Sequence, residues 1–347
     1  MKTAVALSGG ADSLASLLLL RDLGHDIMPF HASLTSQSDQ EEETTEKLRH
    51  ICLNLGLSLV MLDLTSDFEQ AVIEPFVQSY LKGLTPNPCA SCNQQIKFGV
   101  MFHRVRSMGA SFMATGHYAG IFRDKNGVSL CRAKDRSKDQ SYFLSLVPAD
   151  TFLHVIFPLH QMSKAQTLEF LRQKNVTPPV QAESNEICFI KTDYRDYLSN
   201  MIPDHSARST GPIINRQGME LGRHKGLWRY TQGQRKGLGI AHEHPLYVLG
   251  KDCSINALIV GSRKELLTET CVADLINLHT PAAQWPDKVF VQTRYRQKAG
   301  EASVTIIDNR MHINFCQPRD IPAPGQVAAV YSEHGRIMAA GIIVDKE

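Results

Sequence analysis

The chain has 347 residues, which is long for one hydrophobic core and predicts two or three domains. Hydrophobic residues make up 43% and charged residues 21% of the chain, a balance typical of soluble globular proteins. The net charge of +2 excludes a uniformly basic chain, so any nucleic-acid surface must come from a local concentration of Lys and Arg.

No apolar run is long enough to span a bilayer, and residues 1–10 lack an apolar segment of signal-peptide length. We therefore expect a cytoplasmic location and no membrane partner. Because that compartment is reducing, the eight cysteines are not expected to form disulfides, and clustered ones indicate metal binding or catalysis. Five isolated cysteines are interpreted as small core or surface residues: Cys52, Cys131, Cys253, Cys271 and Cys316.

The N-terminal part alternates predicted strands with predicted helices. Short apolar segments predict strands at residues 3–7, 26–34, 57–64 and 111–117. Helical patterns occupy residues 13–24, 41–56 and 93–106. This alternation predicts βαβ units and a parallel sheet covered on both faces.

The loop at residues 8–13, with the sequence SGGADS, separates the first predicted strand from the first predicted helix, where open α/β sheets bind ligands. Its glycines allow the backbone to approach an anion, and its serine hydroxyls and the helix amides would point at that anion. Asp12 would repel a phosphate unless a cation lay between them, which favours Mg²⁺ bridging Asp12 and a polyphosphate. The alternative is an ordinary Gly-Gly turn with a Ser or Asp helix cap.

Cys89 and Cys92 lie in a proline-containing loop directly before the helix predicted at residues 93–106. This spacing is compatible with a redox couple, half of a zinc site, part of an iron–sulfur site or coincidence. A thioredoxin-like role fits poorly, because the pair follows a long connection and not a first strand. Cys188, between two apolar residues, would by itself be interpreted as an inert buried thiol.

From about residue 208 the composition changes to glycine-rich and basic. Residues 208–251 contain eight Lys or Arg and two Glu, which favours either a nucleic-acid surface or a solvated loop region. Beyond Pro245, short β-rich segments alternate with turn signals at residues 245–252, 255–262, 288–297, 302–309, 310–315, 326–332 and 337–345. This pattern predicts a small antiparallel barrel or sandwich.

The order strand, SGGxDS loop, helix resembles the PP-loop of N-type ATP pyrophosphatases. Further stretches occur in order along the chain and are together similar to the tRNA-specific 2-thiouridylase (MnmA/TrmU) family. They are LTPNPCASCNQQIKFG at residues 84–99, ATGHYA at 114–119, KDQSYFL at 138–144, ESNEICFI at 183–190, GQRKGLGI at 233–240, TRYRQ at 293–297 and PGQVAAVY at 324–331.

The resemblance implies an α/β plus β fold in three parts. A doubly wound parallel-sheet PP-loop domain, of the adenine nucleotide α-hydrolase type, is expected over residues 1–205. A small central tRNA-binding domain is expected over residues 206–268, and a C-terminal β-barrel over residues 269–347. The implied reaction uses ATP to adenylate O2 of the wobble uridine of certain tRNAs, releases pyrophosphate and replaces O2 with sulfur.

The resemblance also implies the binding residues. The residues expected to bind the ATP phosphates are Ala6, Leu7, Ser8, Gly9, Gly10, Ala11, Asp12 and Ser13. The backbone near His31 and Gly116 is expected to bind the adenosine. Those expected at tRNA are Asn87, Pro88, His117, Lys138, Asp139, Gln140, Arg294, Tyr295 and Gln326. The alternative interpretation of His117 is a structural residue. That of Tyr295 is a tyrosine on a barrel strand, with its ring buried and its hydroxyl in contact with water.

For sulfur transfer the resemblance implies Cys92 and Cys188. In a persulfide relay, Cys188 receives sulfane sulfur, and Cys92 releases it by forming a disulfide with Cys188. The sulfur donor is expected to be a cysteine desulfurase, a sulfur carrier or inorganic sulfide. Cys92 opens a predicted helix, whose dipole is expected to lower the thiol pKa.

Cys89 is a departure, because many members of this family carry Asp at that position. Three cysteines could instead hold three irons of a [4Fe–4S] cluster, which is the interpretation we prefer here, or Zn²⁺, which suits the set less well. The alternative functions are a PP-loop amide ligase, a different tRNA thiolase, and a non-catalytic RNA-binding protein with a structural metal.

Overall fold

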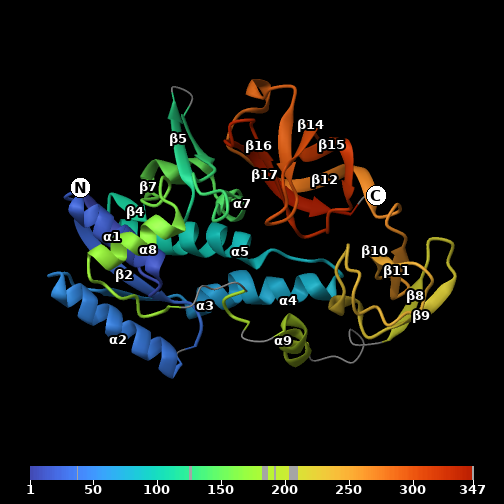
Figure 1. Ribbon diagram of the computed structural model, residues 1–347, viewed down its shortest axis with the longest axis horizontal. Helices are drawn as coiled ribbons and strands as arrows, with labels where there is room; N and C mark the ends of the chain where they lie inside the picture. Colours follow the sequence, from blue (N-terminus) through green and yellow to red (C-terminus); the bar gives the residue numbers. More distant parts are fainter. Residues whose placement is uncertain (37, 125–126, 182–186, 191–192, 203–209, 346–347) are drawn as a thin grey trace.

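The computed structural model describes residues 1–36, 38–124, 127–181, 187–190, 193–202 and 210–345. A helix-covered parallel sheet forms one side of the molecule, and a β-barrel and a smaller sheet form the other (Figure 1). The boundary expected between residues 205 and 206 lies outside the described residues.

The N-terminal sheet is parallel and has the strand order β3-β2-β1-β4-β7. Its strands are β1 (Lys2–Ala6), β2 (Asp26–Ser33), β3 (Val60–Asp63), β4 (Phe112–Ala114) and β7 (Val155–Ile156). The four strands predicted from sequence are confirmed within a few residues at their ends. The fifth, β7, has two residues and is too short to give a sequence pattern.

Helices cover both faces of this sheet, as a parallel sheet requires. On one face α1 (Ala11–Asp22) and α8 (Lys164–Gln173) pack side by side, and α1 buries a row of leucines against Val5 and Leu7. The acidic helix α2 (Asp39–Asn54) is capped at its N-terminus by Ser38, whose side chain accepts a hydrogen bond from the Glu41 amide. On the other face the core includes residues of the helical segments that follow Asn87.

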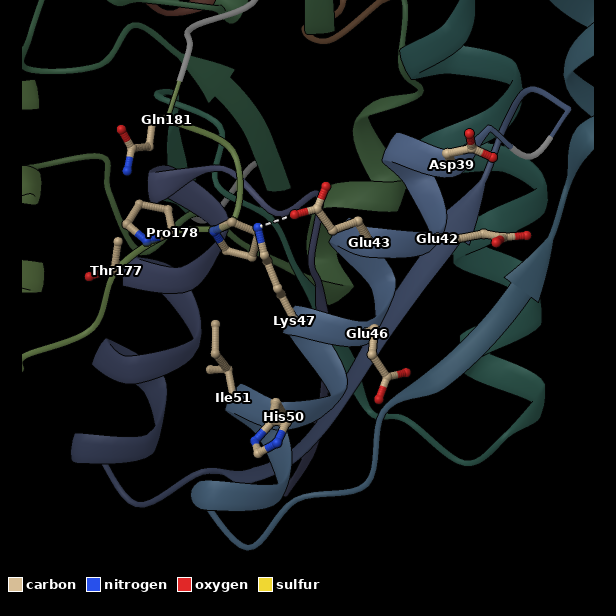
Figure 2. Close-up of a pocket in the computed structure, with 11 residues that line it drawn as sticks. Asp39, Glu42, Glu43, Glu46, Lys47, His50, Ile51, Thr177, Pro178 and Gln181 are labelled. Atoms are coloured by element: carbon tan, nitrogen blue, oxygen red, sulfur yellow. Dashed lines mark hydrogen bonds and ion pairs between the residues drawn. The ribbon is translucent and has the colours of Figure 1, made fainter.

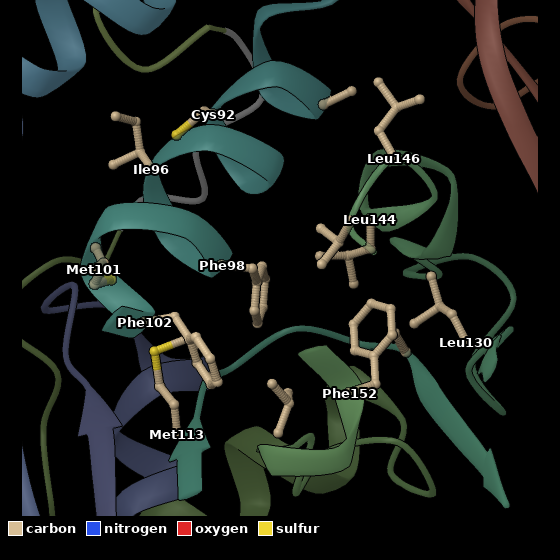
Figure 3. Packing of buried hydrophobic residues seen from close by; sticks show 14 of the residues in the cluster. Cys92, Ile96, Phe98, Met101, Phe102, Met113, Leu130, Leu144, Leu146 and Phe152 are labelled. Carbon is tan, nitrogen blue, oxygen red and sulfur yellow. The ribbon is translucent and has the colours of Figure 1, made fainter. Parts of the chain in front are cut away.

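Those segments are α5 (Pro88–Ser91), the π-helical η2 (Cys92–Met101) and α6 (Phe102–Ser107). The helical character predicted for residues 93–106 is confirmed, but most of the stretch is wound as a π-helix. Figure 3 shows its inner face, where Cys92, Ile96 and Phe98 point into the hydrophobic core.

Shorter elements connect these parts. They are α3 (Thr65–Phe68), the π-helical η1 (Glu69–Ile73), α4 (Glu74–Leu81), the hairpin strands β5 (Gly120–Asp124) and β6 (Gly127–Cys131), α7 (Ser141–Leu144), the 3-10 segments η3 (Ala149–His154), η4 (Leu227–Arg229) and η5 (Ala282–Gln284), and α9 (Tyr194–Met201). No helix of the described residues is both long enough and apolar enough to cross a membrane.

The basic, glycine-rich region contributes to a small sheet with the order β10-β11-β8-β9. Its strands are β8 (Gly211–Ile214), β9 (Glu220–His224), β10 (Tyr247–Asp252) and β11 (Ala257–Gly261). Two segments that the sequence placed with the C-terminal β-rich series, residues 245–252 and 255–262, therefore belong to this sheet and not to the barrel.

The predicted barrel is confirmed as a closed barrel with the order β12-β15-β14-β13-β16-β17. Its strands are β12 (Leu267–Leu278), β13 (Val289–Gln292), β14 (Gly300–Ile307), β15 (Arg310–Asp320), β16 (Val327–Tyr331) and β17 (Ile337–Val344). Sequence analysis missed β12, because only Cys271 and Ala273 of its twelve residues are buried and its apolar pattern is weak.

Candidate functional site

The candidate phosphate loop, residues 8–13, has the conformation that its glycines permit. Gly9 has a φ of +83°, and a side chain there would place its Cβ 2.7 Å from Cγ2 of Thr44. The Ser13 hydroxyl donates to the Gly10 carbonyl over 2.8 Å and accepts from the Ser8 amide over 3.2 Å. Helix α1 starts at Ala11 without a side-chain cap, so its first amides are directed at the loop and can bind an anion.

Asp12 in this loop has partners that the sequence did not reveal. Its Oδ1 accepts from Lys164 Nζ over 2.7 Å and from the Tyr118 hydroxyl over 3.0 Å. Its Oδ2 has no hydrogen bond within the described residues, so one carboxylate oxygen is available to a cation. Lys164 begins α8, far along the chain, and only the packing of α8 on α1 places it at the loop.

Both positions predicted at the adenosine border the phosphate loop. A Cβ on Gly116 would lie 2.7 Å from the carbonyl carbon of Asp12 and 2.8 Å from the Ser13 nitrogen, so this glycine lets the loop after β4 rest against α1. His31 Nδ1 lies 2.6 Å from the carbonyl oxygen of Leu7. The structure therefore brings together residues 6–13, His31 and Gly116.

A large groove lies next to this loop but is separate from it. It has a volume of about 1010 Å³ and lies between α2 and residues 177–181, which also contact the loop through Val180 N donating to Gly9 O over 3.0 Å (Figure 2). Its lining residues are Asp39, Glu42, Glu43, Glu46, Lys47, His50, Ile51, Thr177, Pro178, Pro179 and Gln181. None of the predicted site residues lines it.

The three cysteines singled out from the sequence come within electrostatic range of one another. Cys92 is buried and Cys89 is half-buried. Cys188 is exposed as a residue, although its thiol group is desolvated. The charge of Cys188 acts on both Cys89 and Cys92. Folding thus joins two segments that are almost a hundred residues apart.

The expected low pKa of Cys92 is wrong. Burial raises the pKa of the Cys92 thiol to about 11 and also raises the pKa values of Cys89 and Cys188. Desolvation outweighs any helix-dipole effect, because η2 begins inside the core and its first residue is not open to water. The charge of Lys97 opposes this effect at all three thiols.

Lys97 is a functional candidate that sequence analysis missed. In an α-helix, residues five apart point about 140° away from each other. In a π-helix the hydrogen bond runs between residues five apart, which brings Lys97 nearer to the side of Cys92 than an α-helix would. The charge of Lys97 acts on the Cys92 thiol. Lys97 is half-buried, and no ion pair or hydrogen bond of its side chain is found within the described residues.

No group of three or more His, Cys, Asp or Glu in the described residues is arranged to hold a metal ion. The three cysteines therefore do not form a metal-binding set here, and the [4Fe–4S] cluster stays a prediction that this geometry does not support.

Comparisons with known proteins show the family to which the chain belongs. Family models match residues 1–192 (tRNA methyl transferase HUP domain), 197–262 (tRNA methyl transferase PRC-barrel domain) and 268–343 (Aminomethyltransferase beta-barrel domain). A tRNA-specific 2-thiouridylase MnmA of Nitratidesulfovibrio vulgaris (strain DSM 19637 / Miyazaki F) is 45% identical over 99% of both chains. One of Oleidesulfovibrio alaskensis is 46% identical over 99% of both. The chain belongs to the MnmA/TrmU family of tRNA-specific 2-thiouridylases.

The residues that the family resemblance assigned to tRNA binding differ in how deeply they are buried and in which parts of the protein they contact. Asn87 Oδ1 accepts from the Ala90 amide over 3.1 Å and so caps α5, and Pro88 is buried. Gln326 of the barrel donates to the carbonyls of Thr85 and Pro86 over 2.9 and 3.1 Å. These contacts hold the loop that carries Cys89 against the barrel.

Asp139 is buried and fully engaged within the protein. It accepts from Arg132 over 2.8 Å, from the Ala133 amide over 2.9 Å and from the Ser141 hydroxyl over 2.9 Å. Gln140 Oε1 accepts from the Tyr118 amide over 2.9 Å, and Lys138 is half-buried.

Arg294 is exposed, and Tyr295 is half-buried with its ring 4.3 Å from that of Phe143. His117 is buried, and burial together with the charge of Lys97 holds its pKa well below the usual range. Arg294 is thus the one exposed member of this set, and the tRNA contacts of all nine residues stay predictions.

Lys97→Met is expected to slow sulfur transfer at neutral pH. Removing this cation raises the pKa of the thiols further, and each pKa unit lowers the thiolate fraction by about tenfold. The loss should shrink as the pH rises toward the thiol pKa. The measurement is the single-turnover rate of tRNA thiolation against pH, with Lys47→Met on the exposed side of α2 as the matched control. An unchanged pH profile for Lys97→Met would contradict this role.

Proposed function

We propose that this protein is an ATP-dependent tRNA-uridine 2-sulfurtransferase. It adenylates O2 of the wobble uridine, releases pyrophosphate and replaces O2 with sulfur to give 2-thiouridine. The single observation that carries the proposal is the gathering of Cys89, Cys92 and Cys188 in a chain whose first strand ends in a phosphate loop. Full-length relatives named tRNA-specific 2-thiouridylase support it.

Activation by ATP suits the phosphate loop. A carbonyl oxygen of uracil is a poor leaving group, whereas AMP is a good one. The amides at the start of α1 would bind the phosphates, and Lys164 would move from Asp12 to the charge that develops on the departing pyrophosphate. Mg²⁺ would offset further phosphate charge, with the free oxygen of Asp12 as its ligand from this chain.

Sulfur transfer is proposed to run through Cys188 and Cys92. Cys188, at an exposed position, takes sulfane sulfur from a donor and becomes a persulfide. The Cys92 thiolate then attacks Sγ of the Cys188 persulfide, and the bond from Sγ to the outer sulfur breaks. The outer sulfur leaves as hydrosulfide, and a Cys92–Cys188 disulfide remains, which an external thiol must reduce. The hydrosulfide attacks C2 of the uridine, and AMP departs.

The tRNA is proposed to lie across the basic central region and the barrel. Arg294 can pair with a phosphate and Tyr295 offers a stacking face. We propose the division at residues 1–205, 206–268 and 269–347 as the corresponding functional units.

The experiment is reconstitution with the purified full-length protein. Unmodified tRNA, ATP, Mg²⁺ and a sulfide or persulfide source should yield 2-thiouridine in nucleoside digests, with pyrophosphate release that depends on tRNA. Pyrophosphate release that depends on a carboxylic acid and ammonia, without tRNA, would favour an amide ligase. Methylated uridine made from S-adenosylmethionine, without thiolation, would favour the activity named in the family models.

A further inference from the structure

Two buried polar atoms without a protein partner line the same small cavity. Lys251 Nζ, on strand β10 of the small sheet, and Gln232 Oε1, in the loop before that strand, have no hydrogen-bond partner among the described residues. The cavity has a volume of about 30 Å³. Buried polar atoms without a partner are rare in folded proteins, so a donor and an acceptor that share one cavity point to a ligand.

The cavity lies where the three parts of the chain meet. The N-terminal domain contributes Lys82 and Thr85, from the segment between α4 and α5. The barrel contributes Pro324, which precedes β16, and Asp345, which follows β17. The small sheet contributes the two atoms without a partner, so a ligand in this cavity would touch all three parts.

Size and charge together select the ligand. One water molecule occupies about 30 Å³ in the liquid, which matches the volume of the cavity. An anion would face the Gln232 oxygen and the Asp345 carboxylate, and a cation would face the Lys251 ammonium. Water is neutral, accepts from an ammonium and donates to an oxygen, so it satisfies both atoms.

The two side chains are oriented for such a bridge. Gln232 Nε2 donates to the Leu249 carbonyl over 3.2 Å, which leaves Oε1 as the atom that needs a donor. Burial lowers the pKa of Lys251 to about 8, so the amine is mostly protonated at neutral pH and can donate. The charges of Lys251 and Asp345 act on each other without a direct hydrogen bond, a gap that water can span.

The Lys251 side chain packs against the segment between α4 and α5. Gly83 in this segment has a φ of +77°, and a Cβ there would lie 3.7 Å from Lys251 Cδ. On the barrel side, the Thr85 amide donates to the Pro324 carbonyl over 2.8 Å. The segment leads directly into residues 87–92, which include two of the three cysteines. The position of the Lys251 side chain therefore affects that of the cysteine loop.

We propose that this cavity binds one water molecule, which accepts a hydrogen bond from Lys251 and donates one to Gln232, and that this bridge positions the segment leading to the cysteine loop. The second hydrogen of the water is available to the Asp345 carboxylate. Lys251 and Gln232 are thus positioning residues, a role that rests on the proposed sulfur transfer, whereas the water site itself does not.

The first test is a crystal structure of the full-length protein at a resolution that shows water. One water is expected within about 3.2 Å of both Lys251 Nζ and Gln232 Oε1. A halide in this place, identified by anomalous scattering after a bromide soak, would overturn the proposal. So would direct contact between the two side chains with no water between them.

The second test is a double-mutant cycle measured by hydrogen exchange. The amides of residues 82–85 are all hydrogen-bonded, so their exchange reports on the position of the segment. Lys251→Met and Gln232→Leu should each raise their exchange rate about tenfold, since one net hydrogen bond is at stake. Because either change releases the water, the double variant should exchange no faster than the single variants.

Side chains that act separately predict another result for this cycle. The effects would then multiply to about a hundredfold in the double variant, which would overturn the bridge. Lys47→Met, on the exposed side of α2, is the control and should keep the wild-type exchange rate.

The third test measures positioning through the proposed reaction. In single turnovers Lys251→Met should lower the maximal rate of tRNA thiolation about tenfold, for the same loss of one hydrogen bond, and leave the half-saturating tRNA concentration and pyrophosphate release unchanged. Lys251→Gln, which keeps a donor, should restore most of the rate. Weaker tRNA binding with an unchanged maximal rate would overturn the positioning role and favour a direct tRNA contact.

The failure of this inference and that of the proposed function are distinguishable. Wild-type protein that does not thiolate tRNA would refute the proposed function and the positioning role with it. The crystal structure and the exchange cycle then still decide the water site, because neither measurement involves the reaction.

Discussion

Cys92→Ser is expected to lower the rate of tRNA thiolation by at least about 10³-fold, because Cys92 is the nucleophile that we propose releases the sulfur held on Cys188. Adenylation precedes this step, so tRNA-dependent pyrophosphate release in a single turnover should remain close to the wild-type rate. Both quantities are measured on the same reaction, as 2-thiouridine in nucleoside digests and as released pyrophosphate. Cys316→Ser, at an exposed position in the barrel strand β15, is the control and should leave both unchanged.

Cys89→Ser distinguishes the two sulfur schemes. The relay needs only Cys92 and Cys188, so this variant should keep most of its thiolation rate. A cluster with Cys89 as a ligand predicts loss of activity in Cys89→Ser, together with iron and acid-labile sulfide in anaerobically purified wild-type protein. Iron-free wild-type protein and an active Cys89→Ser variant would reject the cluster.

Asp139→Ala is expected to destabilise the protein by about 3–5 kcal/mol. It removes the carboxylate that pairs with the half-buried Arg132 and accepts from the buried Ala133 amide and Ser141 hydroxyl. Arg132 also donates to Gln292 of the barrel and lies 3.7 Å from the centre of the Tyr331 ring. The loss should therefore loosen the contact between the sheet domain and the barrel. The free energy of unfolding is measured by denaturant titration.

The same variant tests the predicted tRNA contact of Asp139. Asp150→Ala, at an exposed position in η3, is the control and should change the free energy of unfolding by less than about 0.5 kcal/mol. Normal stability of Asp139→Ala combined with weakened tRNA binding would contradict the structural role and favour direct contact with tRNA.

Local patterns were enough to predict the parallel sheet, the phosphate loop and the barrel. Apolar runs bounded by glycine mark β1 to β4, because buried parallel strands need apolar side chains on both faces. They were not enough for β12, in which only two of the twelve residues are fully buried. They also could not divide the β-rich C-terminal part correctly, because β10 and β11 look like barrel strands and differ only in their partners.

By itself the sequence was enough to predict the candidate residues for the chemistry: the SGGADS loop and Cys89, Cys92 and Cys188. Only the tertiary structure decided how those residues behave. Packing placed Lys164 on Asp12, and the fold brought the charge of Lys97 within range of the Cys92 thiol. Burial reversed the expected direction of the Cys92 pKa shift. The physical reason is the same in each case, because charge and desolvation depend on neighbours distant in the chain, which a local sequence pattern does not contain.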